Sequence, residues 1–335
     1  MGMKLFCLDT ARPLGDEVAA AVGVPLAAHE ERTFDDGEHK VRPLENVRGC
    51  DVYVLQALAA DATASVDDRL VRLLFMVGAL RDASAARVTA VLPYLCYARK
   101  DRRSKPRDPL ATRYVASLIE AMGTDAVLTL DVHNLAAYQN AFRIRADHLE
   151  AKWLLIDRLA PRLVGAPVTV VSPDIGGVKR AEAFRASLEA RLGRPVDRAF
   201  LEKHRSDDVL SGELFVGEVA GCDVVVVDDL VSSGGTLRRA AAACRSRGAR
   251  RVFAAATHGV FTADAEALLS DPVLDAIAVT DSVPARRDVT ATASRLEVIG
   301  CAPLFAEAIR RMHEGGSIAE LVEQGLPTRA ATVDG

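Results

Sequence analysis

The sequence predicts an α/β fold with two similar domains, each a mostly parallel sheet flanked by helices. Short apolar runs alternate with longer stretches whose apolar residues recur at helical spacing, which is typical of repeated βαβ units. Some runs, such as residues 224–227, are apolar throughout, as strands buried on both faces should be. The length of 335 residues corresponds to roughly two domains of about 150 residues each.

The individual elements follow from this alternation. The predicted strands are residues 4–8, 52–56, 88–92, 126–130, 168–172, 224–227, 252–256 and 276–280. The predicted helices are residues 68–80, 110–122, 175–192 and 236–247. Because helices separate most of the strands, we expect crossover connections between parallel neighbours in each half of the chain.

The best domain boundary lies in residues 159–167, where two prolines and a glycine interrupt the pattern. In each half, a strand ends in acids and polar loop residues, so the two halves resemble one another in rhythm. We therefore divide the chain into residues 1–150 and residues 151–325. The last helix of the second domain remains free to pack back on the first.

Composition and charge exclude several classes of function. Lysine and arginine number 42 and the acids 46, so the net charge is 42 − 46 = −4, which does not favour nucleic acid or an anionic membrane. No apolar stretch approaches the roughly 18 residues of a membrane span. The six cysteines contain no C-x-x-C pair and mostly flank apolar runs, as buried reduced thiols do. We predict a cytoplasmic protein with no nucleic-acid or membrane partner.

The strongest functional signal begins where the apolar strand 224–227 ends. The segment reads Asp228-Asp229-Leu230-Val231-Ser232-Ser233-Gly234-Gly235-Thr236. Glycines let backbone N–H groups approach a phosphate, hydroxyls add donors, and the following helix contributes its positive end. The acids suit the hydroxyls of a sugar that carries the phosphate. Two acids and three hydroxyls exceed what an ordinary helix cap needs, so the pattern predicts a sugar-phosphate site.

This loop resembles the phosphoribosyl pyrophosphate (PRPP) loop of phosphoribosyltransferase-fold proteins, and further motifs narrow the resemblance. They are Phe34-Asp35-Asp36-Gly37-Glu38, Tyr97-Ala98-Arg99-Lys100-Asp101-Arg102, Leu130-Asp131-Val132-His133, Ser172-Pro173-Asp174-Ile175-Gly176-Gly177-Val178 and Thr257-His258-Gly259-Val260-Phe261. Together they are similar to the motifs of the ribose-phosphate pyrophosphokinase (PRPP synthetase) family. The resemblance implies that both domains are phosphoribosyltransferase-like.

The resemblance also implies an activity, that of a ribose-phosphate diphosphokinase in nucleotide biosynthesis. Such an enzyme moves the diphosphoryl group of ATP to the C1 hydroxyl of ribose 5-phosphate and releases AMP. The implied partners are ATP and ribose 5-phosphate, the implied cofactor is Mg²⁺, and the implied assembly is a homo-oligomer, either a dimer or a hexamer. Because the nucleophile is an alcohol of the substrate, the protein mainly positions two polyanions and offsets their charge.

Roles for individual residues follow from the same resemblance. Lys203 and Arg205 match the Lys-x-Arg of a mobile catalytic loop, and His133 and Asp174 match positions associated with magnesium ions. The residues implied to bind ATP are Phe34, Asp36, Glu38, Arg99, Lys100, Asp101 and His133. Those implied to bind ribose 5-phosphate are Asp228, Asp229, Ser232, Ser233, Gly234, Gly235 and Thr236. The loop of residues 34–38 is expected to complete the nucleotide pocket of a neighbouring subunit.

Several alternatives remain open on the sequence. Phe34 could be a core residue, His133 could be hydrogen-bonded at a strand end, Asp174 could cap the next helix, and residues 99–107 could form a solvated basic run. A PRPP-consuming phosphoribosyltransferase would share residues 228–236, but it would not need the other motifs. A non-catalytic PRPP-synthetase-associated regulatory subunit would depart from the enzyme at catalytic positions, which are present in this chain.

Overall fold

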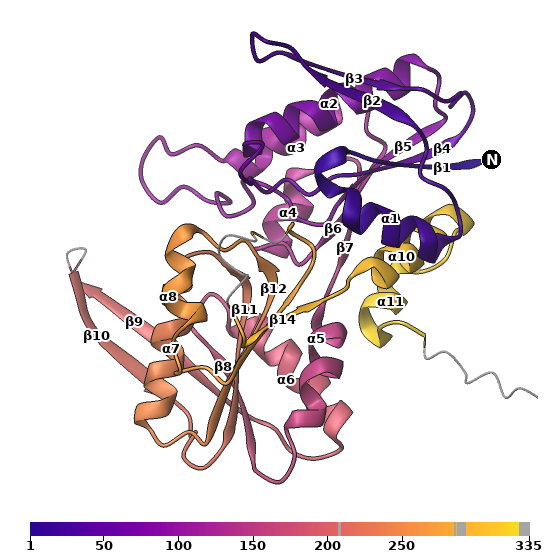
Figure 1. The fold of residues 1–335 in the computed structure, drawn as a ribbon. Coiled ribbons are helices and arrows are strands. Elements are labelled where there is room, and N and C mark those ends of the chain that lie inside the picture. The colour runs from indigo at the N-terminus through magenta and orange to yellow at the C-terminus, as the bar shows by residue number, and fades with distance from the viewer. Residues whose placement is uncertain (207–208, 285, 287–292, 328–335) are drawn as a thin grey trace, which may run out of the picture. The chain divides into compact units, whose positions relative to one another are not determined.

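The structure is a computed structural model that describes residues 1–206, 209–284, 286 and 293–327, with side chains 203–206 and 209–213 left out of the description. The described residues divide into two compact units (Figure 1). Unit 1 contains residues 1–150, 282–284 and 301–327, and unit 2 contains the remainder. No helix within these described ranges is both long enough and apolar enough to cross a membrane.

Unit 1 is built on a five-stranded, fully parallel sheet in the order β1-β4-β5-β6-β7. These strands are β1 (Met3–Cys7), β4 (Asp51–Leu55), β5 (Arg87–Leu92), β6 (Ala126–Leu130) and β7 (Arg145–Leu149). Its helices are α1 (Arg12–Val22), α2 (Val66–Asp82), α3 (Ala111–Ala121), α4 (Leu135–Ala141), α10 (Ala302–Glu314) and α11 (Ile318–Gln324). A separate antiparallel hairpin, β2 (His29–Thr33) and β3 (His39–Pro43), lies beside α2 (Figure 1).

Unit 2 is built on a seven-stranded sheet in the order β10-β9-β8-β11-β12-β13-β14, in which only β9 and β10 pair antiparallel. These strands are β8 (Val168–Ser172), β9 (Asp197–Ser206), β10 (Val209–Val216), β11 (Asp223–Val231), β12 (Arg251–Gly259), β13 (Ala276–Thr280) and β14 (Leu296–Ile299). Its helices are α5 (Lys152–Leu159), α6 (Val178–Leu192), α7 (Gly235–Ser246) and α8 (Glu266–Leu269).

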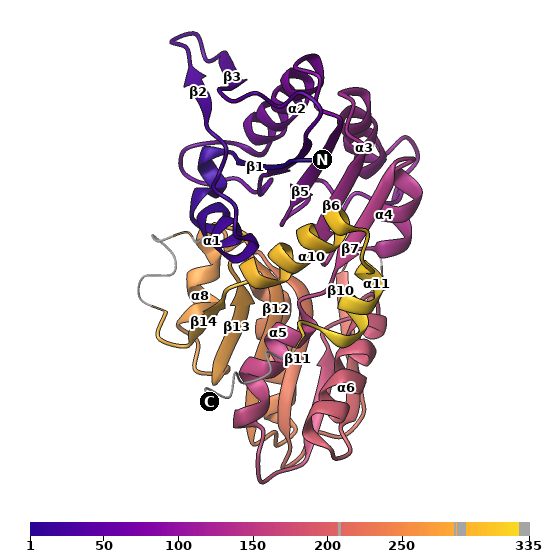
Figure 2. The same cartoon turned by 90° about the vertical axis from the view of Figure 1, so that its right-hand side faces the viewer.

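The predicted fold class is confirmed, and every predicted strand and helix is present near its predicted bounds. Residues 301–327 belong to the same compact unit as residues 1–150, so the C-terminal helices pack with the N-terminal part of the chain. The physical reason is that α10 packs along α1, as Figure 1 and Figure 2 both show. The Arg87 side chain also donates to the carbonyl of Met312, and His313 Nδ1 lies 2.6 Å from Asp51 Oδ2.

Each unit contains an ion pair between an aspartate and an arginine at the start of two adjacent strands, and we call this ion pair the brace. Asp51 of β4 lies in register with Arg87 of β5 and accepts from its Nε at 2.6 Å. Asp223 of β11 lies in register with Arg251 of β12 and accepts from its Nε at 3.1 Å. Burial alone would raise the pKa of each carboxyl, but hydrogen bonds with guanidinium groups outweigh burial and lower it. This repeated contact supports the description of two similar domains.

Candidate active site

The turn of the β2–β3 hairpin carries three predicted ATP-binding residues. Phe34 N–H donates to the Glu38 carbonyl at 2.8 Å, and Glu38 N–H donates to Asp36 Oδ1 at 3.0 Å. Gly37 closes the turn with φ of +90°, a conformation that glycine adopts without a steric cost. Phe34 is 37% exposed, so it is not a core residue. The turn therefore presents one aromatic ring and three carboxylates to solvent.

A second group of predicted ATP-binding residues gathers at the carboxyl edge of the unit 1 sheet. Residues 99–101 follow β5, His133 follows β6, and these two strands are parallel neighbours. Asn134 Nδ2 donates to Asp101 Oδ2 at 2.7 Å, so the two loops are joined. Arg99, Lys100 and His133 are exposed. This edge offers cations, a carboxylate and an imidazole to a ligand.

The loop that carries His133 has an unusual backbone. Asp131 has φ of +38°, although it is not glycine, and such conformations are often found at functional sites. Asp131 N–H donates to the Leu149 carbonyl at 2.9 Å, and Val132 N–H lies 3.3 Å from His148 Nε2. Both partners belong to β7, which the sequence analysis did not predict. Hydrogen bonds to β7 therefore hold this loop in place.

Unit 2 brings the two predicted ribose-binding acids next to an arginine that the sequence analysis missed. Arg180 of α6 places Nη1 3.3 Å from Asp229 Oδ1 and 3.7 Å from Asp228 Oδ1. Burial and the negative charge of Asp229 raise the pKa of Asp228, whereas Arg180 opposes that rise. The only signal in the sequence was the position of Arg180, shortly after the Gly176-Gly177 pair.

The predicted phosphate turn, residues 232–236, is held by the loop that follows β12. Phe261 N–H donates to the Val231 carbonyl at 2.9 Å, and Thr262 N–H donates to the Ser232 carbonyl at 3.1 Å. Gly234 has φ of +76°, and an added Cβ there would lie 2.5 Å from Leu268 Cδ2. Helix α7 begins at the next residue, so its free N–H groups open at the turn. The turn therefore ends in the free N–H groups of a helix, which are suited to an anion.

Asp174 lies at the end of β8, a parallel neighbour of β11, and it is half-buried. Its Oδ1 accepts from Gly177 N–H at 3.0 Å, directly before α6 begins. Ser172 Oγ donates to the Asp174 carbonyl at 2.6 Å. Asp174 therefore stabilises the turn before α6, although no side chain caps the helix itself, and it lies at the same carboxyl edge of the sheet as the acid pair.

Lys203 and Arg205 were expected in a loop, but the backbone of both residues forms a strand. Both residues belong to strand β9, where Lys203 lies opposite Glu213 and Arg205 lies opposite Leu210 of β10. The physical reason is that the antiparallel pairing with β10 extends β9 to Ser206, with an irregularity between Leu210 and Gly212. Their side chains lie outside the described residues.

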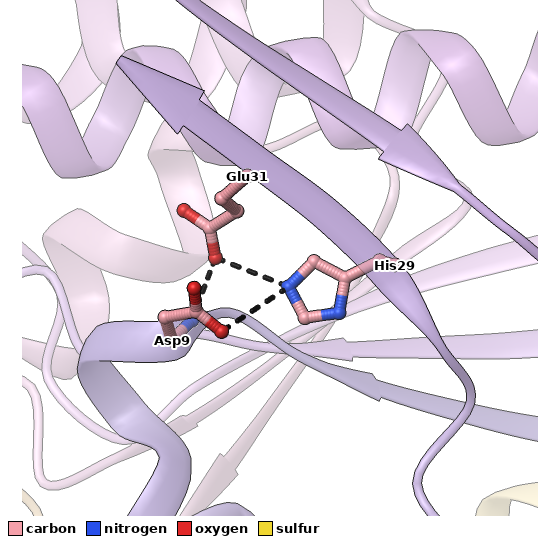
Figure 3. A group of neighbouring side chains, drawn as sticks. All are labelled: Asp9, His29 and Glu31. Atoms are coloured by element: carbon pink, nitrogen blue, oxygen red, sulfur yellow. Dashed lines mark hydrogen bonds and ion pairs between the residues drawn. The ribbon is translucent and has the colours of Figure 1, made fainter.

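One group of side chains with metal-ligand atoms occurs among the residues that the structure describes, and it was not predicted. Asp9, His29 and Glu31 place their ligand atoms within 4.8 Å of one another (Figure 3). Arg72 Nη1 lies 3.2 Å from Glu31 Oε2, so a positive charge already faces this group. The predicted metal residues lie elsewhere, His133 in unit 1 and Asp174 in unit 2.

Comparison with known proteins gives matches over most of the chain. Residues 3–123 match the model of the N-terminal domain of ribose phosphate pyrophosphokinase, and residues 211–323 match that of the phosphoribosyl synthetase-associated domain. The chain is 39% identical over 320 residues to the ribose-phosphate pyrophosphokinase of Caldanaerobacter subterraneus subsp. tengcongensis, covering 95% of this chain and 97% of that protein. It is also 39% identical to the ribose-phosphate pyrophosphokinase of Granulibacter bethesdensis, covering 96% of this chain and 100% of that protein.

A solved structure is similar over the same extent. The crystal structure of phosphoribosylpyrophosphate synthetase from Mycobacterium smegmatis superposes with a TM-score of 0.86 at 35% identity. The superposition covers 94% of this chain and 100% of that one. The similarity therefore includes both units.

Proposed function

The chain belongs to the ribose-phosphate pyrophosphokinase family and transfers the diphosphoryl group of ATP to ribose 5-phosphate, and we propose the following roles for its residues. The predictions of this family, this fold and this enzyme class from the sequence are confirmed. A phosphoribosyltransferase that consumes PRPP is disfavoured, because the relatives named ribose-phosphate pyrophosphokinase align with almost the whole chain.

We propose that unit 2 binds ribose 5-phosphate, and the geometry of residues 228–236 carries this proposal. The free N–H groups at the start of α7 would bind the 5-phosphate, with hydroxyl donors from Ser232, Ser233 and Thr236. Asp228 and Asp229 would accept hydrogen bonds from the ribose hydroxyls. Arg180 would favour the ionised form of this acid pair and oppose the rise in the pKa of Asp228, because it lies within 4 Å of both carboxylates.

Unit 1 would bind ATP. Arg99 and Lys100 are exposed cations that suit the triphosphate, and Asp101 and His133 lie at the same edge of the sheet. Phe34, Asp36 and Glu38 project from a hairpin turn, where a ring can stack on adenine and a carboxylate can accept from its amino group. We propose that this turn serves the nucleotide site of a second copy, in a homo-oligomer.

Lys203 and Arg205 are proposed to contact the phosphates that react. The C1 hydroxyl of ribose 5-phosphate attacks the β-phosphorus of ATP, its proton leaves, and AMP departs. Negative charge spreads over the transferred group during this step, so a point charge and a bidentate guanidinium both stabilise it.

Mg²⁺ is the proposed cofactor, and Asp174 of unit 2 and His133 of unit 1 are each proposed as a ligand of a magnesium ion. Mg²⁺ is a hard cation that commonly takes only one or two protein carboxylates together with phosphate oxygens and water. The half-buried carboxylate of Asp174 fits this requirement, since a hydrogen bond from Gly177 involves one of its two oxygens. When bound, the ion would neutralise charge on the phosphate oxygens.

Other properties of the chain are proposed on general grounds. All six cysteines are free, and all except Cys50 are buried, which suits a reducing compartment such as the cytoplasm. The net charge of −4 supports small anionic substrates held by local cations, not a nucleic-acid partner.

Incubation with ATP, Mg²⁺ and ribose 5-phosphate tests this function. Phosphorus NMR should show a new diphosphate on C1 and the release of AMP in equal amount. Release of ADP with a monophosphorylated sugar would contradict diphosphoryl transfer. If nothing turns over while both substrates bind, the regulatory-subunit alternative is favoured.

A further inference from the structure

Glu31 is the buried centre of a cluster of polar side chains at the base of the β2–β3 hairpin. Its Oε1 accepts from Asp9 N–H at 2.6 Å and lies 3.1 Å from His29 Nε2, as Figure 3 shows. Its Oε2 lies 3.2 Å from Arg72 Nη1. The Glu31 side chain is only 7% exposed, so these contacts replace water at a carboxylate that would otherwise be costly to bury.

The partners of Glu31 come from the body of unit 1 as well as from the hairpin. Asp9 follows β1, and Arg72 belongs to α2. Arg72 also donates from Nη2 to Thr33 Oγ1 at 2.8 Å, and Thr33 is the residue immediately before Phe34. Arg72 therefore contacts both the middle and the end of β2. The cluster fixes β2 against the domain just before the turn begins.

The neighbouring carboxylate, Glu30, makes a different set of contacts. It lies 2.8 Å from Arg42 and 3.4 Å from Lys40, and both cations belong to β3. Its side chain is 32% exposed. Glu30 thus joins the two strands of the hairpin to one another, whereas Glu31 joins the hairpin to the rest of unit 1. This difference makes Glu30 a matched control for Glu31.

The cluster is better explained as a positioning device than as a cation site. Both oxygens of Glu31 are already engaged, one by an N–H group and the other by a guanidinium. Burial alone would raise the pKa of Glu31, but hydrogen bonds from His29 and Asp9 N–H and the charge of Arg72 lower it. The carboxylate is therefore ionised and neutralised by groups of the protein itself.

We propose that Glu31 is a positioning residue that orients the hairpin turn of residues 34–38 for nucleotide binding. This inference rests on the proposed function, in which Phe34, Asp36 and Glu38 contact ATP. It predicts that weakening the cluster damages ATP binding and leaves ribose 5-phosphate binding and the chemical step intact.

The first test compares Glu31→Gln with Glu30→Gln. Glutamine keeps the shape of the side chain but removes the charge that pairs with Arg72. We expect the KM for ATP to rise about tenfold in Glu31→Gln, which corresponds to about 1.4 kcal/mol and is near the lower end for a hydrogen bond to a charged group. Its kcat and its KM for ribose 5-phosphate should not change, and Glu30→Gln should resemble the parent enzyme in all three constants.

Arg72→Met provides a second route to the same measurement if Glu31→Gln folds poorly. It leaves the carboxylate in place and removes the contacts with Glu31 and Thr33, so it should also raise the KM for ATP alone. An unchanged KM for ATP in both variants would overturn the proposal. Equal damage to both substrates' KM values and to kcat would overturn it as well, since that pattern indicates general destabilisation.

Mixing subunits separates this proposal from the proposed function. At an ATP concentration well below the raised KM, Glu31→Ala protein mixed with Lys203→Ala protein should exceed the average activity of the two, because hybrid sites combine an intact hairpin with an intact β9. Asp36→Ala mixed with Lys203→Ala is the reference for a shared site. If only this reference gains activity, the role of Glu31 is refuted. If neither mixture gains, the shared site is wrong, and the KM comparison decides on Glu31.

Discussion

Replacing Arg180 with methionine tests whether the acid pair of β11 must be ionised to bind ribose. Arg180 Nη1 lies 3.3 Å from Asp229 and 3.7 Å from Asp228, and these two side chains are only 5% and 20% exposed. Burial and the charge of Asp229 raise the pKa of Asp228, and Arg180 is the cation that limits this rise. Removing Arg180 should therefore raise the pKa of Asp228 further.

The size of the effect follows from the distances and the exposure. A cation within about 4–6 Å typically lowers a carboxyl pKa by about 1–3 pH units. Arg180 is 24% exposed, so solvent screens part of its charge, and we expect the low end, about one pH unit. A protonated carboxyl is a weaker acceptor for a sugar hydroxyl. The acid limb of kcat/KM for ribose 5-phosphate should therefore move to higher pH, with a loss of about tenfold at a fixed pH on that limb.

The assay is the pH profile of kcat/KM for ribose 5-phosphate in Arg180→Met and in Lys179→Met. Lys179 is an exposed cation adjacent on α6, so its loss should leave the limb in place. Stability gives a second readout. A carboxyl whose folded pKa is raised stabilises the fold at low pH, and this contribution is lost as pH rises through the folded pKa. That loss should extend to higher pH in Arg180→Met. If the acid limb of the Arg180→Met profile lies at the same pH as that of the parent enzyme, the role of Arg180 is refuted.

Three further predictions concern other parts of the molecule. Lys203→Ala should lower kcat by about 10²–10³ with little change in the KM for ribose 5-phosphate, measured by single-turnover kinetics, and an unchanged kcat would remove this residue from the mechanism. Gly234→Ala should raise the KM for ribose 5-phosphate but not for ATP in steady-state assays, since its φ is +76° and the new Cβ would meet Leu268; unchanged ribose 5-phosphate binding would contradict the phosphate turn. Asp223→Asn should lower the free energy of unfolding of unit 2 by about 2–3 kcal/mol at neutral pH in urea titrations followed in unit 2. Because hydrogen bonds lower the pKa of Asp223, that difference should vanish as pH falls through the lowered pKa, and a difference that persists in acid would contradict the brace.

The sequence alone determined the α/β class, the positions of the central strands and the turn of residues 232–236. Residues 126–130, 168–172 and 276–280 were predicted with the same bounds as β6, β8 and β13. These strands are buried at every position, so their composition is mostly apolar and the local pattern suffices. The turn at Gly234 could also be predicted from the sequence, because glycines and hydroxyl residues between a strand and a helix favour a turn through local interactions alone.

Strands with mixed or polar composition were not predicted. The hairpin strand His29–Thr33 is polar throughout, and Asp197–Ser206 has apolar residues only at positions 199–201. Such strands have little apolar pattern to read, and their pairing with a partner strand is what makes them extended. The C-terminal helix Ala302–Glu314 likewise belongs to unit 1 because of the face it packs against α1, which its own sequence does not specify.

Only the tertiary structure decided which polar side chains meet. Arg180 and Asp229 are 49 positions apart, and Arg72 and Glu31 are 41 apart. Local propensity acts over a few residues, whereas these contacts depend on the order of strands in each sheet and on the helix that crosses beside them. Charged residues on many surfaces have the same local composition. Their roles here follow from burial next to an opposite charge, which exists only once the sheet has formed.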